Sequence, residues 1–223
     1  MSLILLFIMS AIMLMPKYLK FRNSEYMLES GNSFIKTVFD KGKYGEFLTF
    51  TYLEELDFFK KLLVNIYVPK DDGSTTEIDL VMLSPTGIYV FESKNYSGWI
   101  FGNEKSKYWT QTLQNKQKNK FFNPIWQNKG HITALKNNLE LVEDSLFKSY
   151  IIFSERCELK KVERDSTKVK VIKRNHLIST LKEDIANSDN VFKVDEILDI
   201  YIKLKQYSNV DAETKIKHIE SIT

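Results

Sequence analysis

The fold of this chain is decided by residues 77–94, which read EIDLVMLSPTGIYVFESK. Both halves of this stretch are rich in β-branched, aromatic and other apolar residues, which favour strands. Between the halves, Ser84-Pro85-Thr86-Gly87 has the composition of a tight turn. The stretch therefore predicts two antiparallel strands, 77–83 and 88–94, joined as a hairpin.

The alternation of side chains along this hairpin brings acidic residues together. A turn centred between Pro85 and Thr86 places Asp79 opposite Glu92, with Cβ atoms roughly 4.5–5.5 Å apart. Carboxylates at that separation repel unless a proton or cation lies between them, and their hard oxygens suit Mg²⁺ or Mn²⁺. Lys94 shares the face of Glu92, where its ammonium can stabilise a phosphoryl charge. The hairpin predicts a metal site; the alternative is a set of exposed cross-strand ion pairs.

Helix and strand patterns alternate along the rest of the chain. We expect helices over 24–39, 42–57, 123–142, 176–186 and 194–206, and strands over 62–68, 99–101, 108–113, 150–153 and 169–172. Asn123 followed by Pro124 is typical of a helix start. With 223 residues, 43% of them hydrophobic, the chain can bury a core of its own. The order of elements predicts an α/β fold, a mixed central sheet flanked by helices, preceded by an N-terminal hydrophobic helix.

The amino terminus is strongly apolar. Residues 1–15 contain no charged residue, and Lys17, Lys20 and Arg22 follow them. The apolar run falls short of the ~20 residues that cross a bilayer. We expect residues 1–20 to be a membrane anchor, residues 21–40 to be a connecting helix, and the basic flank to favour a cytoplasmic body. An interfacial helix, a buried core helix, a misassigned start and a soluble cytoplasmic protein are the alternatives.

Several classes of protein are excluded by what the sequence lacks. A single cysteine, Cys157, excludes an intrachain disulfide framework and a cysteine-rich zinc module. The three histidines are widely spaced and follow no zinc-ligand pattern. Neither a P-loop nor a GxGxxG motif is present, which argues against a nucleotide-driven motor.

Positive charge is concentrated in one segment. Although the whole chain carries only +3, residues 105–139 contain seven lysines and no acidic residue. Such a basic stretch predicts a polyanionic partner, and we assign nucleic-acid contacts to Lys105, Lys107, Lys116, Lys118, Lys120 and Lys129. Aromatic residues interleave with these lysines, namely Tyr108, Trp109, Phe121, Phe122 and Trp126. We expect most of these rings to be core, and any exposed one to stack on an unpaired base. A loop facing anionic lipid is the alternative.

Asp79 followed by Glu92-Ser93-Lys94 resembles the PD-(D/E)xK signature of restriction-endonuclease-like nucleases. The wider pattern is similar to the nuclease-related domain (NERD) family over residues 41–153, about half of the chain. It comprises Gly45-Glu46, Glu77-Ile78-Asp79, residues 87–94, Gly98-Trp99, Asn123-Pro124 and Gln127. An ExK triplet alone is weak, but the ordered set is specific. Ile78 stands where the signature has proline, a position that varies among such nucleases.

The resemblance implies roles for individual residues. Asp79 and Glu92 would bind Mg²⁺ or Mn²⁺, with the backbone carbonyl of Ser93 as a third ligand, and Lys94 would be the catalytic lysine. Glu46 would bind the metal directly or through water, although from spacing alone it is equally an acid on a solvated helix face. Gln127 would orient the scissile phosphate or a water; without the resemblance it is an ordinary polar residue.

The resemblance also implies an architecture and a function. It implies a restriction-endonuclease-like domain over residues 41–155, and we expect the extension over 156–223 to cap the sheet or mediate assembly. The activity implied is metal-dependent hydrolysis of nucleic acid, with DNA favoured over RNA. The apolar amino terminus adds the expectation that the protein is tethered to a membrane through residues 1–20. A nucleic-acid-binding module without hydrolysis and a membrane-associated scaffold are the alternatives.

Overall fold

A five-stranded mixed sheet forms the centre of the molecule in a computed structural model, which describes residues 3–164, 168–208, 210 and 212–222. Its strands, in spatial order, are β1 (Lys61–Pro69), β2 (Thr75–Ser84), β3 (Gly87–Lys94), β7 (Phe147–Phe153) and β9 (Val169–Lys173). The first three strands are antiparallel, whereas β3, β7 and β9 run parallel. The expected mixed sheet is therefore present.

The β2–β3 hairpin has the predicted register. Its ladder runs from the pair Ser84–Gly87, next to the turn, to the pair Leu80–Phe91. Both strands are buried over most of their length, because helices cover both faces of the sheet. This explains why the two strands read as nearly continuous apolar runs.

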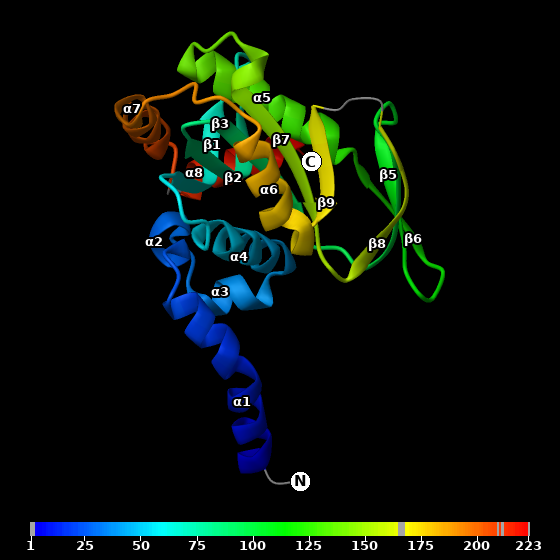
Figure 1. Ribbon diagram of the computed structural model, residues 1–223. Helices are drawn as coiled ribbons and strands as arrows, with labels where there is room; N and C mark the ends of the chain where they lie inside the picture. Colours follow the sequence, from blue (N-terminus) through cyan, green and yellow to red (C-terminus); the bar gives the residue numbers. More distant parts are fainter. Residues whose placement is uncertain (1–2, 165–167, 209, 211, 223) are drawn as a thin grey trace.

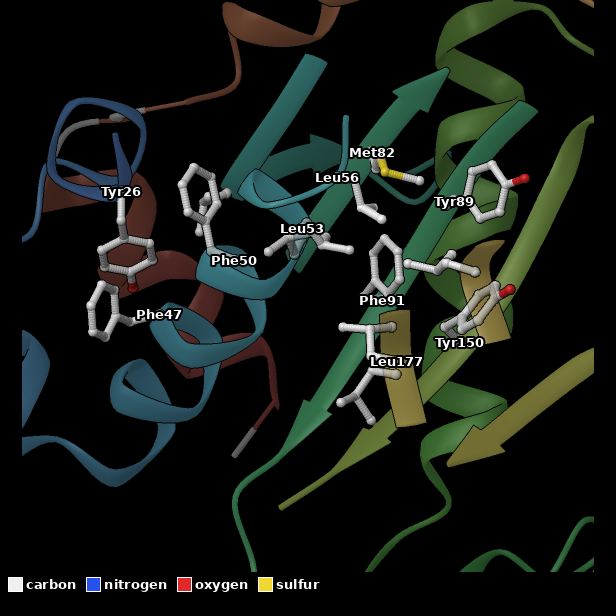
Figure 2. Close-up of a cluster of buried hydrophobic side chains, with 14 of the residues drawn as sticks. Tyr26, Phe47, Phe50, Leu53, Leu56, Met82, Tyr89, Phe91, Tyr150 and Leu177 are labelled. Atoms are coloured by element: carbon white, nitrogen blue, oxygen red, sulfur yellow. The ribbon is translucent and has the colours of Figure 1, made fainter. Parts of the chain in front are cut away.

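Helix α4 (Lys41–Glu54) covers one face of the central sheet. Its Phe47, Phe50 and Leu53 are almost fully buried and pack, within the same cluster, with Met82 and Phe91 of the hairpin (Figure 2). Helix α6 (Leu177–Ala186) adds further leucines to this cluster. Burial of each such side chain contributes about 1.5–3 kcal/mol, so this layer fixes α4 against the hairpin.

The opposite face is covered by helices α5 (Pro124–Leu139) and α7 (Val194–Lys205) (Figure 1). Leu135 of α5 and Ile197 of α7 are fully buried in the cluster that contains Val81 and Val90. Asn123 caps α5 as expected, because its side chain accepts a hydrogen bond from the backbone N–H of Ile125. The helix ends at Leu139, earlier than predicted, because Glu140 takes a left-handed conformation.

A second, four-stranded sheet lies beside the first. Its spatial order is β6 (Lys118–Phe122), β5 (Tyr108–Thr112), β4 (Gly98–Asn103) and β8 (Cys157–Glu163) (Figure 1). Strands β6 and β8 were not expected, because their lysine-rich sequences mask the alternation that marks a strand. The segment after residue 155 contributes β8 to this sheet and β9 to the central one, so it completes both sheets.

Two helical predictions need correction. The single helix expected over 24–39 is two helices, α2 (Tyr26–Ser30) and α3 (Phe34–Phe39), because Gly31 takes a left-handed conformation and Ser33 caps α3. Helix α8 (Ala212–Ile222) was not expected.

The amino-terminal segment forms helix α1 (Leu3–Arg22), which extends away from the sheets (Figure 1). Among the described residues, no helix has the length and apolar character needed to cross a membrane. The predicted anchor over residues 1–20 therefore has no support from the structure. Residues 1–2 and the side chains of residues 3–8, 10 and 11, on which that prediction largely depends, lie outside the described part of the chain.

Candidate functional site

Asp79 of β2 is paired with neither neighbouring strand: the β1–β2 pairing skips it, and the β2–β3 pairing ends at the next residue. Its Oδ2 accepts a hydrogen bond of 2.8 Å from the backbone N–H of Ser93, across the β2–β3 hairpin. On the other side, Asn65 of β1 has a φ of 51°, and the β1–β2 pairing skips this residue. Asp79 is the β2 residue at the skipped position. The carboxylate therefore sits beside two strands whose backbones diverge from regular pairing.

Glu92 of β3 is the most buried carboxylate of the predicted site, with 1% of its surface exposed. Its Oε1 lies 2.6 Å from the Nζ of Lys94, and its Oε2 lies 3.0 Å from the Nε2 of His131. The Nδ1 of His131 in turn lies 2.8 Å from the hydroxyl of Thr76. Both oxygens of Glu92 are therefore fixed by partners on different elements.

Helix α5 supplies two of the side chains that meet the end of β3. Lys94 donates a hydrogen bond of 3.0 Å to the Oε1 of Gln127, and His131 lies one helical turn further on, where residues four apart share a face. The buried Asn128 donates to the carbonyl of Val90 and to the hydroxyl of Ser149. These bonds fix the helix, and with it Gln127 and His131, against the sheet.

Glu46 approaches the site from the opposite helix, α4. A Cβ added at the preceding Gly45 would lie only 2.7 Å from the Cβ of Asn95, so glycine allows α4 to approach the end of β3 closely. The hydroxyl of Tyr26 lies 3.5 Å from the Oε2 of Glu46. The predicted acid is therefore partly enclosed, not on a freely solvated helix face.

Burial and neighbouring charges shift the pKa values of the acidic groups of the site in different directions. Loss of solvent contact raises the pKa of Asp79 well above its usual range, and the charges of Glu92 and Glu46 raise it further, against the opposing effect of Lys94. Loss of solvent contact and the charge of Glu77 likewise raise the pKa of Glu46 to about 7. The surroundings of both carboxyl groups therefore disfavour their charged forms.

Glu92 and Lys94 stabilise each other's charged forms. Burial alone would raise the pKa of Glu92, but the Lys94 ammonium and the hydrogen bond from His131 outweigh burial and lower it. Burial alone would lower the pKa of Lys94, and the carboxylates of Glu92 and Asp79 outweigh it and raise that pKa. A cation and an anion are therefore held side by side at the end of β3.

The donor set agrees with a hard divalent cation. No group of three or more His, Cys, Asp and Glu side chains arranged to hold a metal occurs among the described residues. Mg²⁺ does not need such a group, because it is commonly held by one or two carboxylates and retains several waters. Asp79, Glu92 and the carbonyl of Ser93 would supply oxygen ligands of this kind, and the raised pKa of Asp79 marks a place where a cation would relieve repulsion.

The six predicted nucleic-acid-binding lysines are all exposed. Lys105 and Lys107 lie in the turn between β4 and β5, Lys116 in the turn between β5 and β6, Lys118 and Lys120 on β6, and Lys129 on α5. The expectation that most interleaved rings are core is wrong: Trp109 is buried and Phe121 partly buried, but Tyr108, Phe122 and Trp126 are 52%, 42% and 40% exposed.

Two features of the site were not predicted from the sequence: the role of His131 and the hydrogen bonds around the Ser93 side chain. His131 lies four residues after Gln127, and this spacing was the available signal. The hydroxyl of Ser93 lies 3.2 Å from that of Thr49, which also accepts a hydrogen bond from the fully buried Arg174. No short-range pattern links Arg174 to the hairpin, because it lies far along the chain.

The chain is similar to known proteins over most of its length. Residues 41–154 match the model of the nuclease-related domain. An uncharacterized protein of Bacillus anthracis is 35% identical over 184 residues, which cover 81% of this chain and 82% of the relative. The chain therefore belongs to the nuclease-related domain family. No solved structure matches it significantly.

Proposed function

We propose that this protein is a metal-dependent nuclease of the PD-(D/E)xK type that hydrolyses DNA phosphodiesters. One observation carries the proposal: where the β2–β3 ladder ends, Asp79 accepts a hydrogen bond from the backbone of Ser93, which lies between the ion-paired Glu92 and Lys94, and Gln127 of a helix contacts the lysine. Membership of the nuclease-related domain family supports the same class of reaction.

In this proposal each residue has a defined task. Asp79, Glu92 and the Ser93 carbonyl would hold Mg²⁺ or Mn²⁺, which would supply a Lewis acid. Glu92 and Gln127 fix the Lys94 ammonium between them, and an ammonium has three donors, so one can face an attacking water or a phosphate oxygen. Glu46 adds a carboxylate from α4. Hydrolysis adds water across one P–O bond and leaves a phosphate and a hydroxyl.

The test is cleavage of linear, circular and single-stranded DNA by the full chain with Mg²⁺ or Mn²⁺. Asp79→Asn and Lys94→Ala should lower the rate by roughly 10²-fold or more, the scale for a single charge-stabilising group. Asp72→Asn and Lys70→Ala make the same chemical changes in the exposed β1–β2 turn, and should leave the rate unchanged.

Two results would overturn the proposal. DNA binding without cleavage under every metal condition would make the protein a nucleic-acid-binding module on a nuclease fold. Cleavage that survives both site substitutions would place the chemistry elsewhere in the chain.

A further inference from the structure

The second sheet has one buried and one exposed face. Ile100, Trp109 and Phe121 point inward, toward a cluster that includes Phe153 of the central sheet. Side chains alternate along a strand, so their neighbours point outward. The outward aromatic residues are Trp99, Phe101, Tyr108 and Phe122, which are 50%, 37%, 52% and 42% exposed. Strands β5, β6 and β8 of this sheet lie at one side of the molecule, away from α1 (Figure 1).

Strand register places lysines beside these rings. Trp99 pairs with Thr112, which pairs with Lys118; Phe101 pairs with Thr110, which pairs with Lys120. Adjacent strands are about 4.8 Å apart, so the Cα atoms of each aromatic residue and its lysine lie roughly 10 Å apart, with a threonine between them. The outer face therefore carries a row of rings on β4 and a parallel row of ammonium groups on β6. We call this surface, made by Trp99, Phe101, Thr110, Lys118 and Lys120, the β4–β6 platform; Thr112, which lies between Trp99 and Lys118, is buried.

We propose that the β4–β6 platform binds an unpaired nucleic-acid strand, with bases stacked on Trp99 and Phe101 and phosphates on Lys118 and Lys120. Stacking needs a free base face, which a duplex hides, whereas lysines beside flat rings suit a strand whose bases and phosphates lie on opposite sides. This inference deepens the proposed function and takes from it only the kind of polymer.

The charge of the surface favours a polyanion over an apolar protein partner. Lys118 and Lys120 are exposed on β6, and Lys160 and Lys161 stand on β8 at the other side. Glu158 and Glu163 lie within ion-pair distance of the β8 lysines, but such exposed pairs are weak. The β6 lysines have no acidic residue within the segment 105–139. The surface is therefore apolar along β4 and positively charged at its edge.

The contact already made by Trp99 is weak enough to be replaced. The Nζ of Lys160 lies 5.6 Å from the centre of the Trp99 ring. An exposed contact of this type is weaker than the stacking of a base on an aromatic ring. A base would therefore displace the ammonium, which would be left beside the phosphate backbone.

The β4–β6 platform is joined to the candidate site by a short, fixed link. Trp99 follows Lys94 by five residues, so their Cα atoms are at most about 18 Å apart. Arg156 donates to both the backbone carbonyl and the side-chain oxygen of Asn95, and Gln111 donates to the carbonyl of Ser97. The platform is therefore held at a fixed separation from Lys94.

The test is binding of the full chain to a fluorescent single strand of about 20 thymidines and to a duplex of equal length, in EDTA so that no cleavage intervenes. The double variant Trp99→Ala/Phe101→Ala should weaken single-strand binding by roughly tenfold or more for each ring, and leave duplex binding unchanged. Trp99→Phe should retain most of the affinity. Phe39→Ala, which removes a ring 71% exposed on α3, is the matched control.

A second variant does not depend on the aromatic rings. Lys118→Gln/Lys120→Gln should reduce the slope of log affinity against log salt by about 1.4 for the single strand, because each phosphate contact contributes about 0.7. Both residues are exposed, so the variant should fold, and circular dichroism checks this for each protein.

The outcomes separate this inference from the proposed function. Equal losses on single strand and duplex, or no loss on either, would overturn the platform. So would a dimer in sedimentation that Trp99→Ala/Phe101→Ala dissociates, because the face would then join two copies. Because binding is measured without metal, a protein that binds single strands through the platform but cuts nothing refutes only the nuclease proposal.

Discussion

Replacing Glu46 by glutamine should reduce a pH-dependent loss in the free energy of unfolding. An unfolded glutamate titrates near 4.5, whereas loss of solvent contact and the charge of Glu77 raise the pKa of Glu46 to about 7 in the folded chain. Between these values the folded chain retains a proton that the unfolded chain releases. Unfolding therefore becomes easier as pH rises through this window, and stability levels off above about pH 7.

The size of this effect follows from the two pKa values. At 1.36 kcal/mol for each pH unit between 4.5 and about 7, Glu46 lowers the free energy of unfolding by up to about 3 kcal/mol at pH 8. The neutral Glu46→Gln side chain lacks this penalty, and it also relieves the repulsion that raises the pKa of Asp79. The variant should therefore be more stable than the natural chain at pH 8 and similar to it at pH 4.5.

Urea denaturation followed by circular dichroism, in EDTA at half-unit steps from pH 4.5 to 8.5, measures this directly. The natural chain should lose stability across the window and Glu46→Gln should lose less; some loss remains in the variant because the pKa of Asp79 is also raised. Glu55→Gln changes the same charge at the exposed end of α4 and should follow the natural chain. The reasoning is refuted if Glu46→Gln keeps the full slope, or if the natural chain shows none.

Three further substitutions test the supporting structure. His131→Leu leaves the Oε2 of buried Glu92 without its partner, and should lower the free energy of unfolding by about 1–3 kcal/mol in urea melts; an unchanged midpoint would contradict this. Gly102→Ala places a Cβ 2.1 Å from the Trp109 ring, so it should cost about 1–3 kcal/mol and alter tryptophan fluorescence. Gly130→Ala meets no atom within 4 Å in helix α5, and should instead stabilise by about 0.5–1 kcal/mol. Equal effects of the two glycine changes would show that local crowding does not decide them.

The sequence was sufficient to predict the hairpin because its determinants are local. The turn chemistry of Ser84-Pro85-Thr86-Gly87 and the apolar character of both strands specify one register, and the ladder from Ser84–Gly87 to Leu80–Phe91 has it. The cap at Asn123 was predictable for the same reason, since a side chain and a backbone N–H two residues away decide it.

Features that depend on contacts between distant segments were not predictable. The contact of His131 with Glu92 requires α5 to lie across β3, and nothing near residue 131 specifies that packing. The exposure of Tyr108 and Phe122 likewise depends on which face of the second sheet meets the central one. Aromatic side chains are usually buried, so burial was expected for Tyr108 and Phe122. They point outward because Trp109 and Phe121 occupy the opposite, buried face of the sheet.

The acidic cluster of the site works against the stability of the fold that holds it. Glu46 and Asp79 both have raised pKa values because loss of solvent contact, and then the charges of neighbouring carboxylates, disfavour their charged forms. The surrounding core offsets this cost, since Phe47 and Phe50 on α4 and Phe91 on β3 are almost fully buried beside the site. A divalent cation would reverse the sign of the interaction, because it attracts the same carboxylates that repel one another. Metal binding should therefore stabilise the chain more at pH 8 than at pH 5, and Glu46→Gln should reduce that difference.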